Sequence, residues 1–579
     1  MIFTPEFDDG KSGIPLCEYP RPQFKRDSYF PLNGEWDYAV TSSRETPTEY
    51  DGKILVPYSP ESKASGAARG PKADEFLHYR RFFTLPDGFD IGRVLLNVGA
   101  CDQVCEIKLN GITVGSHEGG YLPFAVELTA ALKSGENELT FVVTDDASSH
   151  IYGRGKQSYA RGGIWYTATS GIWQSVWLES VPETYIRSVK LTPDCDSRTL
   201  KVSVDCDADA LIEAFDGDKV IASGRGRDIT LDVSVCKPWS PSSPELYPIR
   251  ITAGSDVVES YFGLRSFTET VSDGTHLFAV NGIPVFHNGL LDQGYWRDGI
   301  YTPPSARAMY DGIKAVVDLG FNMLRKHIKI EPALWYYYCD VLGVLVWQDM
   351  INGGGRYSKL RINLCPFVNL HINDRNYRKM KRDDPASREW FMREAADTIK
   401  TLYNAVSVCL WTPFNEAWGQ FDAVEVWKKL RAIDDTRLYD HASGWQDKGG
   451  GNIKSRHIYF RKVRLKRDKK RILALTEFGG YSFTDELKKK TFGYKKFESR
   501  EKYSAAVTRL YEKEILPLIK KAGLSATVYT QLTDVEDEIN GLFTPDGKLK
   551  PDGAEIARVN AKLKNAFDGL YAKPQGDDR

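Results

Sequence analysis

The chain has 579 residues, of which 42% are hydrophobic and 27% are charged, and its formal net charge at pH 7 is -1. This length exceeds what one hydrophobic core supports, so we expect three domains. The near-zero net charge lacks the long-range attraction that nucleic-acid binding needs. No apolar run approaches the ~20 residues of a membrane-spanning helix. We therefore expect neither a nucleic-acid partner nor a membrane partner.

The nine cysteines are scattered along the chain, and their odd number argues against a disulfide framework. Cys101 and Cys105 share one face of a strand-like segment without the further ligands that zinc needs, so we expect buried free thiols. The start MIFTPEFDDGKSGIP lacks the basic, apolar and small-residue regions of a secretory signal. These features predict a cytoplasmic protein.

The first half of the chain shows the alternating pattern of β-strands. Short strands such as RVLLNV and NELTFVV, separated by turn signals, predict an antiparallel β-sandwich for residues 1–182. Alternation continues through residues 183–267, where Asp216-Gly217 is a hairpin signal. This shorter segment fits a small immunoglobulin-like sandwich.

From residue 268 to residue 579, short apolar strands alternate with amphipathic helices, which is typical of parallel βαβ units. A (β/α)8 barrel accommodates eight such repeats. Asp384 and Pro385 predict the cap and the first position of a helix. The long polar stretch 352–383 predicts a loop at the barrel mouth. The basic run 460–471 predicts a solvated outer helix. The predicted strands lie near residues 285–289, 321–327, 344–349, 406–411, 437–443, 455–460, 472–478 and 524–531.

Two glutamates follow predicted strands at the end of the barrel where catalytic side chains meet. Glu416 lies in WTPFNEAWGQ after the fourth strand, and Glu477 lies in LTEFGGY at the end of the seventh. Retaining hydrolysis of a glycosidic bond requires one carboxyl to donate a proton and a second carboxylate, roughly 5 Å away, to attack the anomeric carbon. Strands four and seven can bring these two residues together across the mouth, where repulsion and partial burial would raise the pKa of Glu416.

These two motifs resemble the catalytic pair of glycoside hydrolase family 2, and the resemblance extends over nearly the whole chain. The segments PRPQFKRDSYFPLNGEWDY, GGYLPF and SGIWQSVWLE resemble the N-terminal sugar-binding sandwich of that family, a jelly roll. YFGLRSF resembles the exit from the immunoglobulin-like domain, and NMLRKH, CDVLGVLVWQDM and YTQLTDVEDEINGL resemble barrel segments.

The resemblance implies that Glu416 is the proton donor, Asn415 its sugar-binding neighbour and Glu477 the nucleophile. It also places Arg325 near the nucleophile, where a guanidinium would hold Glu477 ionised. Tyr459 ends strand six, and its hydroxyl could donate to Glu477. Further candidates for the sugar pocket are Asp292, Gln293, Asp349, Trp418, His441, Trp445, His457, Gln531 and Asp534.

The sequence also departs from the family pattern. Many members have Arg-x-x-His after strand two, whereas this chain has Arg325-Lys326-His327. The histidine that follows strand one in well-known β-galactosidases is absent, and so is the Asn-x-Lys pair that holds a uronic acid in β-glucuronidases. The segment 161–166 could reach the barrel mouth and close the pocket for exo action.

The resulting hypothesis is a retaining exo-β-glycosidase with a carbohydrate substrate, no cofactor and no metal. β-Galactosides are favoured because that activity is common in the family. β-Glucuronidase, β-galacturonidase, β-mannosidase and α-L-arabinosidase specificities stay open, as does a homo-oligomeric state. A non-catalytic carbohydrate-binding scaffold is the alternative from another functional class.

Overall fold

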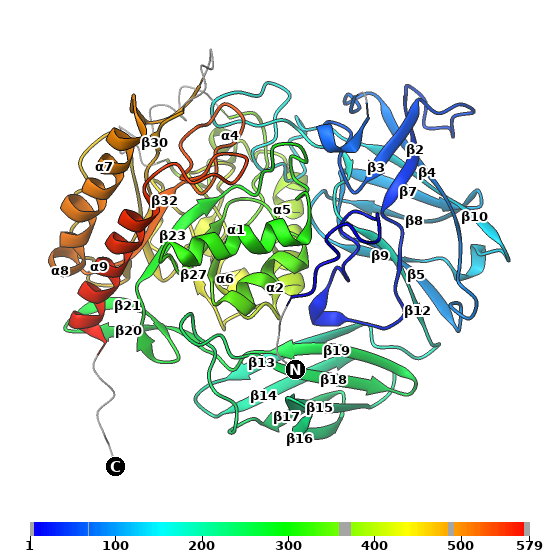
Figure 1. Ribbon diagram of the computed structural model, residues 1–579, viewed down its shortest axis with the longest axis horizontal. Coiled ribbons are helices and arrows are strands. Elements are labelled where there is room, and N and C mark those ends of the chain that lie inside the picture. The colour runs from blue at the N-terminus through cyan, green and yellow to red at the C-terminus, as the bar shows by residue number, and fades with distance from the viewer. Residues whose placement is uncertain (1–4, 68, 358–371, 485–490, 573–579) are drawn as a thin grey trace.

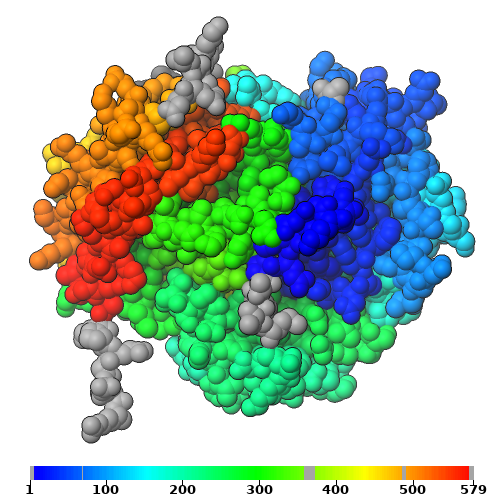
Figure 2. Space-filling view, in the orientation of Figure 1, coloured from blue at the N-terminus to red at the C-terminus, as the bar shows by residue number. Residues whose placement is uncertain are grey.

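The computed structural model describes residues 5–67, 69–357, 372–484 and 491–572. It contains a jelly-roll β-sandwich, an immunoglobulin-like β-sandwich and a (β/α)8 barrel, which is the predicted fold class. The jelly roll (blue) lies beside the barrel (green to red), and the immunoglobulin-like sandwich (teal) packs along one side of both (Figure 1). In the space-filling view, atoms of the jelly roll and of the barrel are in direct contact (Figure 2).

Two antiparallel sheets enclose the apolar core of the jelly roll. The smaller sheet contains, in spatial order, β1 (Phe30–Pro31), β12 (Val176–Val181), β5 (Arg93–Val98) and β9 (Phe124–Glu127). The larger sheet contains β3 (Gly52–Val56), β2 (Gly34–Thr41), β4 (Phe76–Thr84), β10 (Glu136–Thr144), β7 (Val104–Leu109) and β8 (Ile112–Glu118). Every second residue of β7 is buried, as the period of two requires. Cys101 and Cys105 are buried free thiols, as predicted, but they belong to two strands, β6 (Cys101–Asp102) and β7.

The second sandwich also consists of two antiparallel sheets around a core of its own. One sheet contains β13 (Ser188–Asp194), β14 (Thr199–Asp205) and β17 (Asp228–Asp232). The other contains β16 (Lys219–Gly226), β15 (Ala210–Asp216), β18 (Tyr247–Ala253) and β19 (Asp256–Phe262). The hairpin predicted at Asp216-Gly217 is confirmed, because β15 pairs with β16 across it and Gly217 has a φ of 59°.

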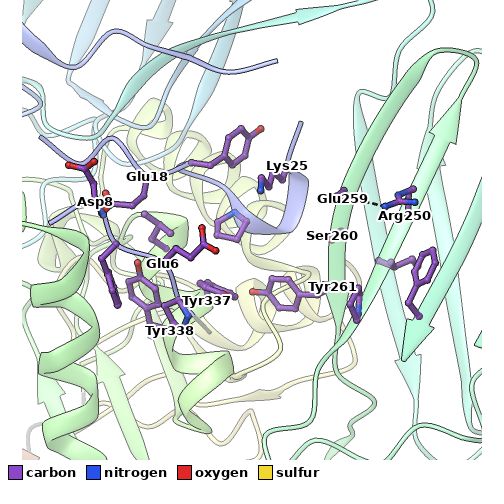
Figure 3. A pocket seen from close by; sticks show the side chains of 18 of the residues that line it. Glu6, Asp8, Glu18, Lys25, Arg250, Glu259, Ser260, Tyr261, Tyr337 and Tyr338 are labelled. Carbon is purple, nitrogen blue, oxygen red and sulfur yellow. Dashed lines mark hydrogen bonds and ion pairs between the residues drawn. The ribbon is translucent and has the colours of Figure 1, made fainter. Parts of the chain in front are cut away.

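A cavity of about 810 Å³ marks the junction between the N-terminal segment, the second sandwich and the barrel (Figure 3). Helix α2 (Ala333–Leu342) contributes Tyr337, whose ring centroid lies 5.5 Å from that of Tyr261 on β19. Arg250 and Glu259 form an ion pair of 3.2 Å on the same wall. Side chains from all three parts of the chain therefore line this junction.

Eight parallel strands form the barrel sheet, and each lies where a strand was predicted. The runs are apolar because both of their faces are covered; all five residues of β26 (Val408–Thr412), for example, are buried. A small sheet of β20 (Phe267–Ser272), β21 (Thr275–Val280) and β22 (Ile283–Pro284) precedes the barrel. In sheet order the barrel strands are β27 (Leu438–Tyr439), β26 (Val408–Thr412), β25 (Leu345–Asp349), β24 (Met323–Lys326), β23 (His287–Asp292), β32 (Leu524–Thr530), β29 (Ile472–Gly479) and β28 (Ile453–Ile458).

Helices cover the outside of this sheet. The predicted helix start is confirmed at α5 (Pro385–Leu402), where Asp384 accepts a hydrogen bond of 2.9 Å from the Ala386 amide. The other helices include α1 (Ala306–Asp318), α4 (Tyr377–Met380), α6 (Ala423–Arg431), α7 (Arg500–Leu510), α8 (Leu516–Ala522) and α9 (Gly553–Tyr571). Within the described ranges, no helix is both long and apolar enough to cross a membrane.

The prediction of an outer helix at residues 460–471 was wrong. This basic segment runs between β28 and β29 without a regular helix. Like charges one turn apart would repel each other in a helix. Asp468 instead accepts hydrogen bonds from the amides of Lys470 and Arg471, and Arg471 pairs with Asp447 at 2.6 Å. These local bonds favour a turn over a helix.

Candidate active site

Glu416 lies in a tight turn just after β26. Glu416 and Ala417 have φ values of 50° and 65°, in the left-handed region that residues with a side chain rarely occupy. The Glu416 amide donates to the Ser443 carbonyl at 2.9 Å, and the Trp418 amide donates to the Asn415 carbonyl at 2.9 Å. The strained turn is therefore fixed by backbone hydrogen bonds, as is common at functional sites.

Glu477 is a buried residue near the carboxyl end of β29. Its Oε2 accepts a hydrogen bond of 2.6 Å from the Tyr459 hydroxyl, and its Oε1 lies 3.3 Å from Nη1 of Arg325. The two glycines that follow permit close packing, because a Cβ on Gly480 would lie 2.2 Å from the Tyr494 ring. That ring stacks on Tyr459 with centroids 3.9 Å apart, so the Gly-Gly turn helps to position the tyrosine that contacts Glu477.

The two carboxyl groups converge on His457, at the end of β28. Nδ1 of His457 lies 2.8 Å from Oε1 of Glu416 and 3.4 Å from Oε2 of Glu477. An oxygen of each carboxyl and this nitrogen all lie within 4.8 Å of one another. The two glutamates that were predicted to meet at the barrel mouth therefore lie close together.

Burial sets the protonation of this cluster. It raises the pKa of Glu416 to about 7, against the opposing positive charges of Lys156 and Arg325. Burial also raises the pKa of Glu477, while the Arg325 charge and the Tyr459 hydrogen bond lower it. The pKa of His457 falls to about 4 because burial disfavours its charged form. Near pH 7 the imidazole is neutral and Glu416 is the carboxyl poised to exchange a proton.

Arg325 connects Glu477 to residues on the neighbouring strands. Its guanidinium donates to Asp349 at 3.0 Å, to the Thr476 carbonyl at 3.0 Å and to Oδ1 of Asn415 at 2.9 Å. Since Oδ1 of Asn415 faces Arg325, its Nδ2 points elsewhere, and this buried atom has no hydrogen-bond partner among the described residues. An amide oriented in this way can bind a ligand hydroxyl.

Glu416, His457 and Glu477 are also residue types that ligate metals, and their donor atoms are close together. The Arg325 guanidinium beside Glu477 would repel a cation bound there. A strained turn, a carboxyl with a pKa near 7 and an arginine-bound second carboxyl instead match acid-base and nucleophilic chemistry.

Comparisons with known proteins give likenesses in sequence and in fold. No protein-family model matches the chain. β-Mannosidase B of Thermothelomyces thermophilus is 26% identical over 456 residues, covering 69% of this chain and 48% of that protein. A β-D-glucuronidase structure from Dictyoglomus thermophilum has a TM-score of 0.74 at 17% identity, covering 94% of this chain and 98% of that one. A family 2 β-galacturonidase of Eisenbergiella tayi, bound to galacturonate, has a TM-score of 0.70 at 17% identity, covering 94% and 99%. These likenesses support an assignment of the chain to the glycoside hydrolase family 2 superfamily. It spans less than half the length of the first curated relatives that it matches.

Some of the other sequence-based candidates lie around the two glutamates. Asp349 bonds both Arg325 and His327, the latter at 2.7 Å. The Trp445 ring lies 5.2 Å from the His457 ring. Gln531 accepts a hydrogen bond of 2.8 Å from Gln293, so these two amides orient each other at the ends of β32 and β23.

Other candidates have structural partners instead. Asp292 forms a buried ion pair of 2.6 Å with Lys326. Asp534 pairs with Lys550 at 2.8 Å. His441 accepts hydrogen bonds of 3.2 Å from the Lys448 and Gly450 amides, and so holds a loop. The carboxylates of Asp292 and Asp534 are thus paired with lysines, whereas only Nε2 of His441 has loop partners and its buried Nδ1 has none among the described residues.

The jelly-roll segment 161–166 does reach the barrel mouth. The Trp165 ring lies 5.3 Å from the Trp418 ring, and Arg161 pairs with Glu536 at 3.0 Å. The Tyr166 hydroxyl donates to Glu538 through a short hydrogen bond. Side chains of the jelly roll and of the barrel therefore both line the barrel mouth.

Sequence reasoning missed several residues of the site, including Lys156, Ser443 and Tyr494. Ser443 Oγ lies 3.1 Å from Nε2 of His457, and Lys156 comes from the jelly roll. None follows a barrel strand within a recognisable motif. Only the fold brings them to the mouth.

Proposed function

We propose that the chain is a retaining exo-β-glycosidase, with Glu477 as nucleophile and Glu416 as acid and base. The observation that carries the proposal is the approach of the two carboxyl groups, within 4.8 Å, at the carboxyl ends of β26 and β29. Inverting enzymes need a wider gap of roughly 6.5–9.5 Å to admit water between substrate and base.

In the first step, a Glu477 oxygen attacks the anomeric carbon while Glu416 gives its proton to the departing glycosidic oxygen. Arg325 and Tyr459 orient Glu477, and the unpartnered Nδ2 of Asn415 is available to a sugar hydroxyl. In the second step, Glu416 takes a proton from water, which attacks the glycosyl-enzyme and releases Glu477. Two displacements at one carbon retain its configuration.

Exo action is supported by the walls of the mouth. Trp165 of the jelly roll packs against Trp418 beside Glu416, and Arg161 and Glu536 form an ion pair across the same interface. A pocket closed on one side accepts the end of a glycan rather than its middle.

The identity of the sugar is the finer part of the proposal. β-Galactosidase, β-glucuronidase and β-mannosidase are among the names of the curated relatives, and the two structures described above are named as a glucuronidase and a galacturonidase. The sequence favours β-galactosides only through the frequency of that activity in the family. We therefore propose a terminal β-linked hexose or hexuronic acid as substrate.

The test is a panel of nitrophenyl glycosides, with the β-galactoside, glucuronide, galacturonide and mannoside and the α-L-arabinoside as members. We expect hydrolysis of at least one β-glycoside with retention at the anomeric carbon, followed by proton NMR, and a loss of about 10⁴-fold or more in Glu477→Gln. A 2-fluoro glycosyl fluoride should add one sugar to Glu477, seen by peptide mass. Inversion, or labelling of another residue, would contradict the proposed roles.

The competing function is a carbohydrate-binding scaffold. It predicts that the unmutated chain binds sugars but turns over no member of the panel. The strained Glu416 turn and the pKa of about 7 favour the enzyme, because neither feature serves binding alone.

A further inference from the structure

Lys156 is a lysine of the jelly-roll domain that is buried at the barrel mouth. The residue is 6% exposed. Its ammonium nitrogen lies 5.4 Å from the ring centroid of Tyr166 and 6.0 Å from that of Trp418. Trp418 is two residues beyond Glu416, so the lysine side chain ends beside the acid-base turn. Its charge lowers the pKa of both Glu416 and His327, which agrees with this position.

The backbone around Lys156 is fixed to the barrel. The amides of Arg154 and Gly155 donate to the Asn352 carbonyl at 2.9 and 3.3 Å, and the Tyr166 amide donates to the Lys156 carbonyl at 3.1 Å. Gly155 has a φ of +58°, and a Cβ there would lie 2.9 Å from the Ile328 carbonyl oxygen. Only glycine permits this close approach, which positions the next residue, Lys156, at the barrel mouth.

The Lys156 ammonium has no carboxylate at ion-pairing distance in the described parts of the chain, whereas Lys326 and Lys329 nearby both pair with Glu331. Glu538 lies next to the same Tyr166 ring, but its oxygens accept hydrogen bonds from Tyr166 and from Asn540. An ammonium on a buried residue that lacks an anion has lost part of its hydration without compensation. An anion that arrives with the substrate would supply that compensation.

A second polar group lies next to this segment without a partner. Asn352, whose carbonyl binds the Arg154 and Gly155 amides, is 4% exposed. Both atoms of its side-chain amide are buried and have no hydrogen-bond partner among the described residues. A lysine and an amide can share the two oxygens of one carboxylate.

We propose that Lys156 is a specificity-determining residue that binds an anionic group of the terminal sugar, with Asn352 as its neighbour. The fitting substrate is a β-linked hexuronic acid; a sulfated hexose would present the same charge. This inference rests on the proposed glycosidase function and names its substrate class. It also assigns the cation to the jelly roll, whereas the sequence lacks the Asn-x-Lys motif in the barrel.

The test compares matched charged and neutral substrates in two variants of Lys156. Lys156→Met keeps the length of the stem but removes the charge, and Lys156→Arg keeps the charge. The substrates are nitrophenyl β-D-glucuronide and galacturonide, the corresponding glucoside and galactoside, and 6-sulfo-galactoside. Lys53→Met is the control, because it removes the positive charge of an exposed jelly-roll lysine that pairs with Asp37.

We expect kcat/KM of the unmutated chain to favour a uronide over its neutral counterpart, and Lys156→Met to lower that ratio about 100-fold. Lys156→Arg should recover part of the ratio, and Lys53→Met should leave it within about threefold. A larger loss on the sulfated hexose than on the uronides would identify sulfate as the recognised anion. Equal losses on charged and neutral substrates would overturn the inference and assign Lys156 to the acid-base function of Glu416.

A binding measurement separates failure of this inference from failure of the proposed function. If the unmutated chain hydrolyses neutral glycosides and Lys156→Met leaves every ratio unchanged, the function stands and the inference is wrong. If no glycoside is hydrolysed, calorimetric titration of glucuronate and galacturonate against glucose and galactose still tests Lys156. Preferential uronate binding that Lys156→Met abolishes supports the inference, and equal binding of acids and hexoses overturns it.

Discussion

The ring nitrogen Nδ1 of His457 lies 2.8 Å from Oε1 of Glu416. The imidazole is neutral near pH 7. Nδ1 therefore either accepts a hydrogen bond from protonated Glu416 or donates one to ionised Glu416. Ser443 Oγ, 3.1 Å from Nε2, can donate or accept a hydrogen bond, so the network serves both states of Glu416. The contact therefore fits a residue that must give a proton in one step and take one in the next.

Replacing His457 should impair that proton exchange. We expect His457→Asn to lower kcat by roughly 10- to 100-fold, with a smaller effect on substrates whose leaving group needs no proton. Stopped assays with nitrophenyl and alkyl aglycones would measure the difference. His441→Asn is the matched control, because this buried histidine accepts hydrogen bonds from loop amides and contacts neither glutamate in the described residues. It should lower the melting temperature but leave kcat unchanged. Equal effects of both variants on kcat would contradict the role of His457.

The pH profile should report Glu416. The first step needs Glu416 protonated, and burial raises its pKa to about 7. Activity, measured as kcat/KM, should therefore fall as the pH rises through about 7. Glu416→Gln should abolish this basic limb, since the amide does not titrate. A basic limb that persists unchanged in the variant would show that another group controls it.

The Arg325 guanidinium should be needed for its geometry as well as its charge. It contacts Asp349, Asn415 and Glu477 at once, and an ammonium cannot reproduce that fork. We expect Arg325→Lys to lower kcat at least 100-fold with a modest change in KM. Arg437→Lys, at a buried arginine that binds backbone carbonyls behind the site, is the control and should affect stability alone. Steady-state kinetics and thermal melts distinguish the two.

The strands and the two acids could be predicted because they depend on local patterns. Apolar runs such as β29 specify barrel strands, and the turns around Glu416 and Glu477 have recognisable motifs. Lys156 could not be predicted, since its position depends on a glycine contact between two domains. The segment 460–471 was predicted as a helix because only its charge was considered. Its hydrogen bonds to Asp468 and the Arg471 ion pair with Asp447 are visible only in three dimensions.

Closure of the mouth by the jelly roll can be tested at Trp165. Its ring packs against Trp418, so Trp165→Ala should open the pocket and raise KM for a terminal glycoside by about tenfold while kcat changes less. Tyr159→Ala is the control, because it removes an aromatic ring from the same loop and Tyr159 is 53% exposed. If both variants behave alike, loop mobility rather than the Trp165 contact governs binding.

Buried acids of the jelly roll and the barrel should make stability depend on pH. Burial raises the pKa of Asp145 and of Glu394 to about 7, from ordinary values of 3.8 and 4.5. The folded state thus keeps protons that the unfolded chain loses, and the stabilisation present below pH 4 is lost as the pH rises to about 7. Asp145→Asn, which can still accept the Ser170 hydrogen bond, should therefore raise the melting temperature relative to the unmutated chain more at pH 8 than at pH 5. The variant Glu136→Gln, at an exposed residue, is the control and should show no such difference. If Asp145→Asn raises the melting temperature equally at both pH values, Asp145 is ionised in the folded protein at both, which contradicts the prediction.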